Sequence, residues 1–208
     1  MKCYKCKKIL KKTDTFCPKC GSKIKGRSKY FLRMLLVLFL LVALVCTGVF
    51  AYEDQQKKKV TNAVIEFLDA YQRADGQVCG KLLYNNDLDA AIEFSETEIL
   101  LAKGVCWKLD KCQWEKNMVR VTVEIENMDF SQVFENLLKQ QDEVTEDALN
   151  NQISQVQLGG QYRKVFVCDV FVYNVDEEWK VSMTEELSNA LHGGMNEYVN
   201  SLIDSEVE

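Results

Sequence analysis

The sequence contains a single histidine and a single proline among its 208 residues. One histidine argues against histidine-based catalysis and against a His-rich metal centre. One proline and 10 glycines exclude collagen-like and low-complexity chains, and an apolar fraction of 47% excludes a disordered chain. Motifs of the types Gly-x-Ser-x-Gly and His-Glu-x-x-His are missing, as are phosphate-binding loops. What remains is a folded chain without a recognisable catalytic motif.

Acidic residues are scarce at the start of the chain and dominate the rest of it. Residues 1–33 hold 12 Lys and Arg against one acid, Asp14, whereas residues 34–208 hold 14 Lys and Arg against 30 acids. The net charge of −5 therefore hides two parts of opposite sign. An apolar run separates these parts, and this arrangement is typical of a membrane topology.

The apolar run extends from Met34 to Tyr52, and its 19 residues carry no charge. An α-helix of this length is about 28 Å long, close to the roughly 30 Å of the hydrocarbon core of a bilayer. The run has no polar face, which argues against the alternative, a buried helix of a soluble protein. We therefore expect one transmembrane helix over residues 34–52.

Basic residues crowd the N-terminal flank of this helix, in residues 25–33, which we expect to form a basic juxtamembrane linker. On the other flank, three lysines at 57–59 are opposed by Glu53 and Asp54. The positive-inside rule then predicts a single-pass protein of the cell membrane, with a cytoplasmic N-terminus and residues 53–208 outside the cytoplasm. The basic linker would contact anionic lipid.

The first part of the chain contains two Cys-x2-Cys pairs, formed by Cys3, Cys6, Cys17 and Cys20. Four thiolates with this spacing can surround one ion tetrahedrally, which is the arrangement that structural zinc prefers. Two alternatives are an iron centre, which four thiolates also bind, and two disulfides, which the cytoplasm disfavours. A unit this small has almost no core, so metal binding would supply most of its folding free energy. The sequence predicts a zinc site with these four ligands.

The segment MKCYKCKKILKKTDTFCPKCG resembles the short zinc ribbon found at the start of many bacterial membrane proteins. The resemblance implies a ribbon domain over residues 1–24 with the same four cysteine ligands, and it names no function. A basic surface could also bind nucleic acid. Lysines beside a membrane helix more often fix topology and contact anionic lipid, so we do not expect nucleic acid to be a partner.

Residues 53–208 are long enough to form one domain with its own core. Their apolar periodicity predicts helices followed by a β-hairpin, further helices, a second hairpin and a closing helix. The expected helices cover about 60–71, 78–103 with a break near Asn85–Asp87, 130–138, 145–156, and 185–203 with an interruption at Gly193–Gly194; the expected strands cover about 105–114, 118–127, 162–174 and 178–184. Ser95 and Glu98 have the spacing of a capping box. This order of elements predicts an α+β fold with an antiparallel sheet.

Two segments resemble the NTF2-like fold, in which a curved antiparallel sheet wraps helices to form a cone. They are the strand that begins at Arg163-Lys164-Val165 and the hairpin Asp176-Glu177-Glu178-Trp179-Lys180-Val181. The chain is most similar to bacterial extracytoplasmic NTF2-like domains without an assigned activity, although its helical stretch over 129–157 departs from the simplest version of the fold. The resemblance implies a domain that binds an envelope protein or a small ligand.

The sequence therefore predicts a membrane-anchored, non-catalytic sensor or scaffold that links a cytoplasmic zinc ribbon to an extracytoplasmic binding domain. The alternative is an NTF2-like enzyme acting on a small apolar or envelope-derived substrate. Such an enzyme needs a carboxylate base near a buried hydroxyl or acid. Asp169 and Tyr173 share a strand face, but a solvated aspartate and a core or interface tyrosine are the simpler interpretation, so we assign no catalytic or cofactor-binding residue. We expect His192 at the surface or at a helix end.

The expected outer domain also contains four cysteines, Cys79, Cys106, Cys112 and Cys168. In a straight strand Cys106 and Cys112 are about 20 Å apart, too far for a disulfide. If disulfides form, Cys79 joins one of these two and Cys168 joins the other, in either combination. The alternative is four free thiols that pack as small apolar side chains.

Overall fold

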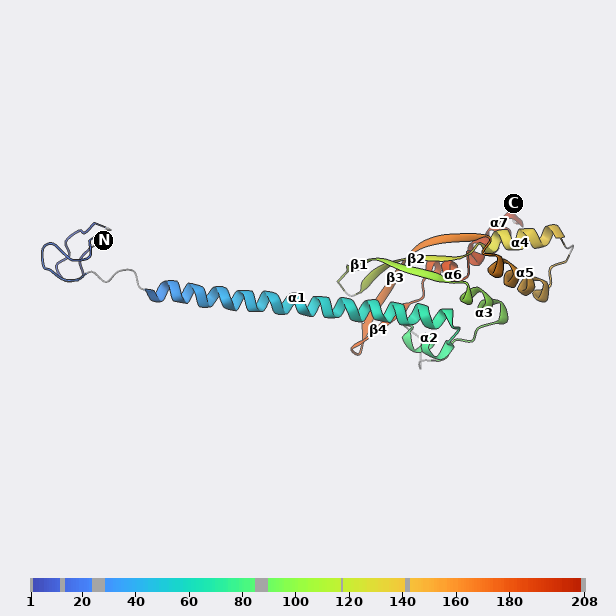
Figure 1. The fold of residues 1–208 in the computed structure, drawn as a ribbon, viewed down its shortest axis with the longest axis horizontal. Coiled ribbons are helices and arrows are strands. Elements are labelled where there is room, and N and C mark those ends of the chain that lie inside the picture. Colours follow the sequence, from blue (N-terminus) through green and yellow to red (C-terminus); the bar gives the residue numbers. More distant parts are fainter. Residues whose placement is uncertain are drawn as a thin grey trace. The chain divides into compact units, whose positions relative to one another are not determined.

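The computed structural model describes residues 2–11, 14–23, 29–84, 90–116, 118–140 and 143–206. The chain divides into two compact units, Met1–Asp54 and Gln55–Glu208 (Figure 1). One helix, α1 (Lys29–Gln72), runs through the boundary between them. Of the expected linker over residues 25–33, residues 29–33 belong to α1, whereas residues 25–28 lie outside the described residues.

The first part of α1 carries the apolar run, and the large apolar side chains between Met34 and Tyr52 are exposed. Among the described residues, α1 is the one helix long and apolar enough to cross a membrane. From Val60 onward the helix buries one face inside the second unit, through Val60, Val64, Phe67, Leu68 and Tyr71. The same helix therefore has a fully exposed apolar part and an amphipathic part.

The second unit is built on an antiparallel sheet, as the sequence predicts, and its four strands have the order β1-β2-β3-β4. The strands are β1 (Cys106–Trp114), β2 (Val119–Met128), β3 (Arg163–Val175) and β4 (Glu178–Ser182). Alternate residues of β2 and β3 are buried because successive side chains of a strand point to opposite faces. Asp176 and Glu177, with φ of 49° and 70°, join β3 to β4 in a two-residue turn of the kind that favours tight hairpins.

A β-bulge interrupts β1 at Asp110, because Leu109 pairs with Val123 whereas Lys111 pairs with Thr122. The extra residue changes which face the following side chains occupy. Cys106 is therefore opposite Glu126 on the solvent face, although Cys112, six residues later, is opposite Val121 on the core face. In a regular strand these two cysteines would share a face.

Helices cover the buried face and one end of the sheet (Figure 1). They are α2 (Gly76–Leu82), α3 (Glu96–Lys103), α4 (Phe130–Gln140), α5 (Glu146–Gly159), α6 (Glu185–Leu191) and α7 (Met195–Glu206). The main core lies between the sheet, α1 and α6, whereas a second apolar cluster joins α3, α4 and α5 to the end of β2. The described residues thus form a mixed fold with seven helices and one antiparallel sheet.

The expected helical stretch over 78–103 is present as α2 and α3, but it is wrong over residues 90–95, which belong to no helix or strand. The expected break near Asn85–Asp87 lies outside the described residues. Residues 90–95 are not helical because the backbone at Ile92 packs closely against Gly76. The Ile92 N–H donates to the Gly76 carbonyl over 2.9 Å. A Cβ at Gly76 would overlap the Ile92 carbonyl, so only glycine permits this contact. The capping box is confirmed, with Ser95 and Glu98 bonding reciprocally at the start of α3.

The expected interruption at Gly193–Gly194 is also confirmed. α5 is capped at its C-terminal end by Gly160, which has a φ of 62°. Gly193 and Gly194 separate α6 from α7, and both have positive φ. A Cβ at Gly193 would overlap the Met128 carbonyl, so the close packing of this turn on β2 requires glycine.

Candidate metal centre

The two Cys-x2-Cys segments adopt the same backbone turn. In the first, the Cys3 N–H donates to the Lys8 carbonyl over 2.8 Å, and the Lys7 N–H donates to the Cys3 carbonyl over 3.0 Å. The second repeats both bonds fourteen residues later, from Cys17 to the Ser22 carbonyl and from Gly21 to the Cys17 carbonyl, each over 2.9 Å. Each turn is closed by a short antiparallel bridge, Lys2 with Ile9 and Phe16 with Lys23. The turns present two sulfurs each toward a shared centre.

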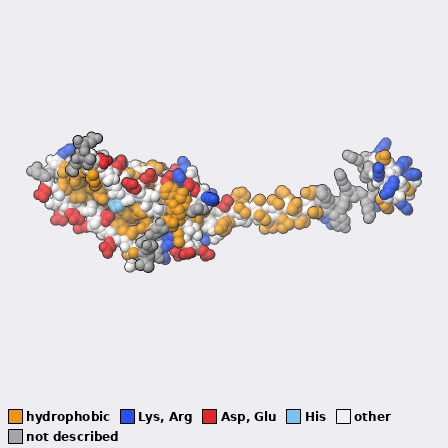
Figure 2. Space-filling view, turned by 180° about the vertical axis from the view of Figure 1, so that it is seen from behind, with side chains coloured by type: hydrophobic (Ala, Val, Ile, Leu, Met, Phe, Trp, Pro, Cys, Tyr) orange, Lys and Arg blue, Asp and Glu red, His pale blue; other side chains and the backbone are white. Residues whose placement is uncertain are grey.

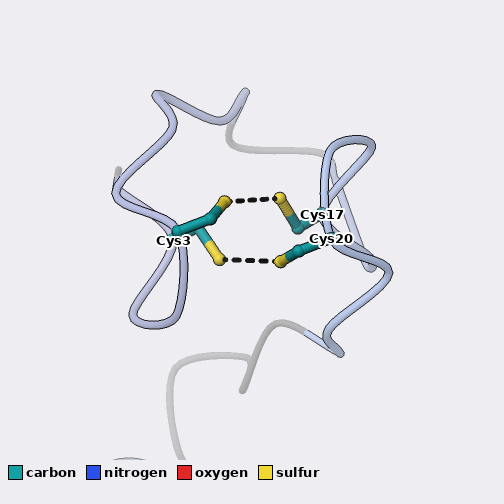
Figure 3. Close-up of side chains that lie close together, drawn as sticks. Cys3, Cys17 and Cys20 are labelled. Atoms are coloured by element: carbon teal, nitrogen blue, oxygen red, sulfur yellow. Dashed lines mark hydrogen bonds between the residues drawn. The ribbon is translucent and has the colours of Figure 1, made fainter.

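The four sulfurs lie within 4.8 Å of one another. Across the centre, Cys3 Sγ is 3.6 Å from Cys20 Sγ, and Cys6 Sγ is 3.5 Å from Cys17 Sγ (Figure 3). A tetrahedron with metal–sulfur bonds of about 2.3 Å has edges of about 3.8 Å. The donor set and its spacing therefore fit one tetrahedrally bound metal ion.

Ser22 is a polar neighbour of the cluster that sequence reasoning missed. Its hydroxyl lies 3.3 Å from Cys3 Sγ and 3.1 Å from Cys20 Sγ. The Ser22 hydroxyl, with backbone N–H groups, lowers the pKa of Cys3 to about 6 and also lowers that of Cys20. A hydroxyl that can donate to sulfur stabilises the thiolate form, which is the form that binds metal. A serine directly after Cys-x2-Cys-Gly was the signal in the sequence.

The pKa of Cys6 is raised, in contrast to those of Cys3 and Cys20. The Lys8 backbone N–H lowers its pKa, but burial and the neighbouring thiols outweigh that effect and raise the pKa to about 11. Four thiols packed this closely cannot all ionise without a cation between them, because like charges repel at short range. Metal binding at this cluster would therefore displace protons.

The unit around the cluster has a very small core, which consists of Cys3, Leu10 and Cys17 with Cys6 packed against them. Two of these core residues are themselves predicted ligands. So little apolar burial cannot offset the entropy of ordering the chain, so a metal ion bound by the four thiols would be the main source of stability. The four predicted ligands are therefore brought together as a group that can hold a metal ion, while the identity of that metal stays a prediction.

The weak catalytic candidates in the second unit do not form a site together. Asp169 and Tyr173 lie on the face of β3 opposite to the buried Cys168, Val170 and Val172. The Asp169 carboxylate accepts hydrogen bonds from Thr122 Oγ1 over 2.8 Å and from Arg120 over 3.4 Å. The Tyr173 ring stacks on Tyr84 at a centroid distance of 4.3 Å. Both residues serve the outer surface of the sheet rather than an enclosed pocket.

His192 is at the C-terminal end of α6, as expected, but it is largely buried and has partners distant in the sequence. Its Nδ1 lies 2.6 Å from the Ser188 carbonyl, which makes Nδ1 the protonated nitrogen. Its Nε2 lies 3.3 Å from the Tyr71 hydroxyl and 3.4 Å from Glu98 Oε1. No sequence pattern connects residues 71, 98 and 192, so this cluster could be found only from the fold.

The four cysteines of the second unit are free, so of the two alternatives left open by the sequence the structure has the four free thiols. Cys79 and Cys168 are buried in the main core, Cys112 is partly buried against it, and Cys106 is exposed. The bulge in β1 explains part of this difference, since it turns Cys106 and Cys112 to opposite faces of the sheet.

The cysteine cluster of the first unit is therefore the group of side chains with the clearest chemistry among the described residues. Its donors are four sulfurs on two equivalent turns, with a hydroxyl next to two of them. A closed set of four protein ligands suits a structural ion, because a catalytic metal needs an open position for substrate or water. Comparison with known proteins finds no matching family model, curated protein or solved structure.

Proposed function

We propose that this chain is a single-pass membrane protein that carries a structural zinc ribbon on the cytoplasmic side and a non-catalytic, NTF2-like binding domain outside the cytoplasm. The role would be that of a sensor, scaffold or accessory factor of the cell envelope. The observation that carries the proposal is the exposed apolar surface of α1 between Met34 and Tyr52. So much contiguous apolar surface is stable in a bilayer and unfavourable in water.

The charges on the two sides of this run support the orientation. Twelve Lys and Arg precede it within residues 1–33, and the acids follow it. Positive charge is retained on the cytoplasmic side of a membrane helix. A reducing cytoplasm would also keep the four clustered thiols available for a metal.

The packing of the second unit supports a binding role over the enzymatic alternative. Its core is filled by large side chains such as Phe67, Leu68 and Ile125, each fully buried beneath the sheet. An enzyme of the expected kind needs a carboxylate inside an apolar cavity, whereas Asp169 is bonded on the opposite face. The antiparallel sheet with helices on its inner face, and the hairpin at Asp176–Glu177, support the NTF2-like assignment.

Two measurements on the full chain test the proposal. Metal analysis of protein purified from membranes should give about one zinc per chain, because four thiolates complete its coordination. Cys17→Ser should lose most of the zinc, whereas Cys46→Ser, which removes a cysteine of α1 outside the cluster, should keep it. Bound iron, or no metal, would contradict the zinc assignment.

The orientation can be tested with Cys106, the exposed thiol of the second unit. A membrane-impermeant maleimide added to intact, wall-stripped cells should label the wild-type chain and the Cys46→Ser variant. The label should be lost in Cys106→Ser. Labelling of Cys106 only after the cells are lysed would place this unit on the cytoplasmic side and reverse the topology.

A further inference from the structure

The N-terminal turns expose apolar side chains that a small water-soluble unit would have no reason to present. Tyr4, Ile9 and Phe16 have 70%, 76% and 56% of their surface exposed. Their exposure is not compensated by a larger core, since among residues 2–11 and 14–23 the buried apolar side chains are those of Cys3, Leu10 and Cys17. Surface apolar residues at this density mark a contact with another apolar phase.

Figure 2 shows many Lys and Arg side chains on the N-terminal unit, with apolar side chains among them. Seven lysines among residues 2–11 and 14–23 are exposed: Lys2, Lys5, Lys7, Lys8, Lys11, Lys19 and Lys23. The one acid in these ranges, Asp14, uses its carboxylate to accept a hydrogen bond from the Lys11 N–H over 2.8 Å. The partner of this surface should therefore carry negative charge on its surface and have an apolar layer beneath that charge.

The bilayer that holds α1 has both properties and is within reach. Residues 24–28 separate Lys23 from the first residue of α1, and five residues span at most about 18 Å. Tethering at this distance keeps the unit close to the surface potential of the membrane, which decays over about 8 Å at physiological salt. Each lysine near an anionic leaflet raises the equilibrium constant for membrane binding roughly fivefold.

We propose that the metal-loaded unit of residues 2–23 docks on the anionic leaflet of its own membrane, with its lysines on the headgroups and Tyr4, Ile9 and Phe16 in the interfacial region. This inference rests on the single membrane span proposed above. It extends lipid contact from the basic segment beside the helix to the face of the ribbon itself. Aromatic and aliphatic side chains flanked by lysine are the composition that binds the interface between headgroups and acyl chains.

Full-length, metal-loaded protein in lipid nanodiscs provides the test. Discs of phosphatidylcholine alone are compared with discs that contain about one third phosphatidylglycerol, a fraction that gives a strong negative surface potential. Both contain a trace of a gadolinium-chelating lipid, and the probe is the Ile9 methyl group, assigned from its absence in Ile9→Val. We expect the paramagnetic relaxation of this methyl to be several times faster in the anionic discs and to fall to the zwitterionic level in high salt.

Two variants separate charge from structure. Replacement of Lys2, Lys5, Lys7 and Lys8 by Gln should abolish the difference between the discs, whereas the same change at Lys103, Lys108, Lys111 and Lys139 of the second unit should leave it intact. Tyr4→Ser with Phe16→Ser should reduce the relaxation in anionic discs. Metal content is measured on each sample, and only metal-loaded variants are compared.

Three results would overturn the proposal. The first is equal relaxation in both discs with metal and span intact, which contradicts the docking alone. The second is salt-sensitive binding of a single-stranded RNA by the basic face of a chain whose relaxation is the same in both discs, which would assign that face to nucleic acid. The third is a chain that does not co-migrate with discs, which would remove the proposed membrane span and the docking with it.

Discussion

Lys7 and Gly21 occupy equivalent positions in the two cysteine turns, although they differ greatly in conformational freedom. Lys7 and Gly21 each follow the second cysteine of a pair, and their φ angles are 60° and 62°. Glycine adopts this left-handed conformation without strain, whereas a residue with a Cβ is disfavoured there by about 1 kcal/mol. The first turn therefore carries strain that the second one lacks.

We expect Lys7→Gly to bind metal about fivefold more tightly than Lys7→Ala, since relief of about 1 kcal/mol of strain adds to the affinity of a unit that folds on metal binding. The comparison with alanine cancels the loss of the lysine charge. Competition with a chromophoric chelator measures both variants. The matched pair Lys5→Gly and Lys5→Ala should show the reverse order, because Lys5 is not among the residues with positive φ. Equal affinities at position 7 would contradict the prediction.

The thiols of the second unit differ in how deeply they are buried. Burial raises the pKa of Cys79 to about 12 and that of Cys168 to about 11, whereas Cys106 is exposed. The thiolate is the reactive form of cysteine. The raised pKa and the burial therefore both make Cys79 and Cys168 less reactive than an exposed thiol.

In a Cys46→Ser background at pH 7.5, we therefore expect Cys106 to react with a maleimide at least about 100-fold faster than Cys79 and Cys168. Peptide mapping by mass spectrometry gives the rates, and unfolding in denaturant should make them similar. Cysteines that react in denaturant only after reduction would show that a disulfide has formed, contrary to the structure.

At the scale of elements, α1, α3 and α6 meet at Tyr71, Glu98 and His192. Burial alone would raise the pKa of Glu98, but hydrogen bonds from Ser95 and the nearby imidazole lower it overall. Burial, with a smaller effect of Glu98, raises the pKa of Tyr71, so its hydroxyl remains protonated. With Nδ1 donating to Ser188, a neutral His192 accepts from Tyr71 at Nε2, whereas a protonated His192 donates from Nε2 to Glu98.

This exchange of partners predicts a pH-dependent coupling between His192 and Glu98. Because the folded pKa of Glu98 is lowered, its contribution to stability is present above its unfolded pKa and is lost as the pH falls through the folded value. A cycle of Glu98→Gln, His192→Gln and the double variant, measured by urea unfolding, should give about 1 kcal/mol of coupling at pH 5.5, where Glu98 is ionised, and much less at about pH 3, where Glu98 becomes protonated. Tyr71→Phe should leave the coupling at pH 5.5 unchanged. Equal coupling at both pH values would contradict a contact that depends on the charge of Glu98.

The elements that could be predicted from the sequence are those whose signal is local. The alternation of Val119, Val121 and Val123 defines β2, and the spacing of Ser95 and Glu98 defines the start of α3. The lack of helix over residues 90–95 could not be predicted, because it depends on the contact of Ile92 with Gly76. The four sulfurs could be assigned from their spacing, whereas the Ser22 hydroxyl and the residues around His192 depend on how distant segments pack.

At the scale of the whole molecule, the two units differ in what stabilises them. Among the described residues, the core of the first unit consists of Leu10 and the two cysteines Cys3 and Cys17. The second unit has a large core beneath its sheet. The three tryptophans, Trp107, Trp114 and Trp179, all belong to the second unit, so their fluorescence reports on that unit alone.

We expect a strong chelator to unfold the first unit without changing the thermal midpoint of the second by more than about 1 °C, since metal binding is coupled to folding only where the ligands lie. Limited proteolysis after chelation should cut within residues 1–23, and tryptophan fluorescence should show the same midpoint with and without metal. The Cys17→Ser variant should behave as the chelated protein does. A large drop in the tryptophan midpoint on chelation would mean that the two units are coupled in stability.

The bulge in β1 has a consequence for how the length of the chain can change. Loss of one residue inside a strand normally turns every later side chain to the wrong face. Asp110 is the exception, because it is the extra residue between the pairs Leu109–Val123 and Lys111–Thr122, and its removal would leave both sets of partners in place. Deletion of Thr122 from β2 is not compensated in this way, because it would move alternating valines of β2 from the core face to the solvent face. A single codon can therefore be lost at position 110 with the sheet and its core conserved.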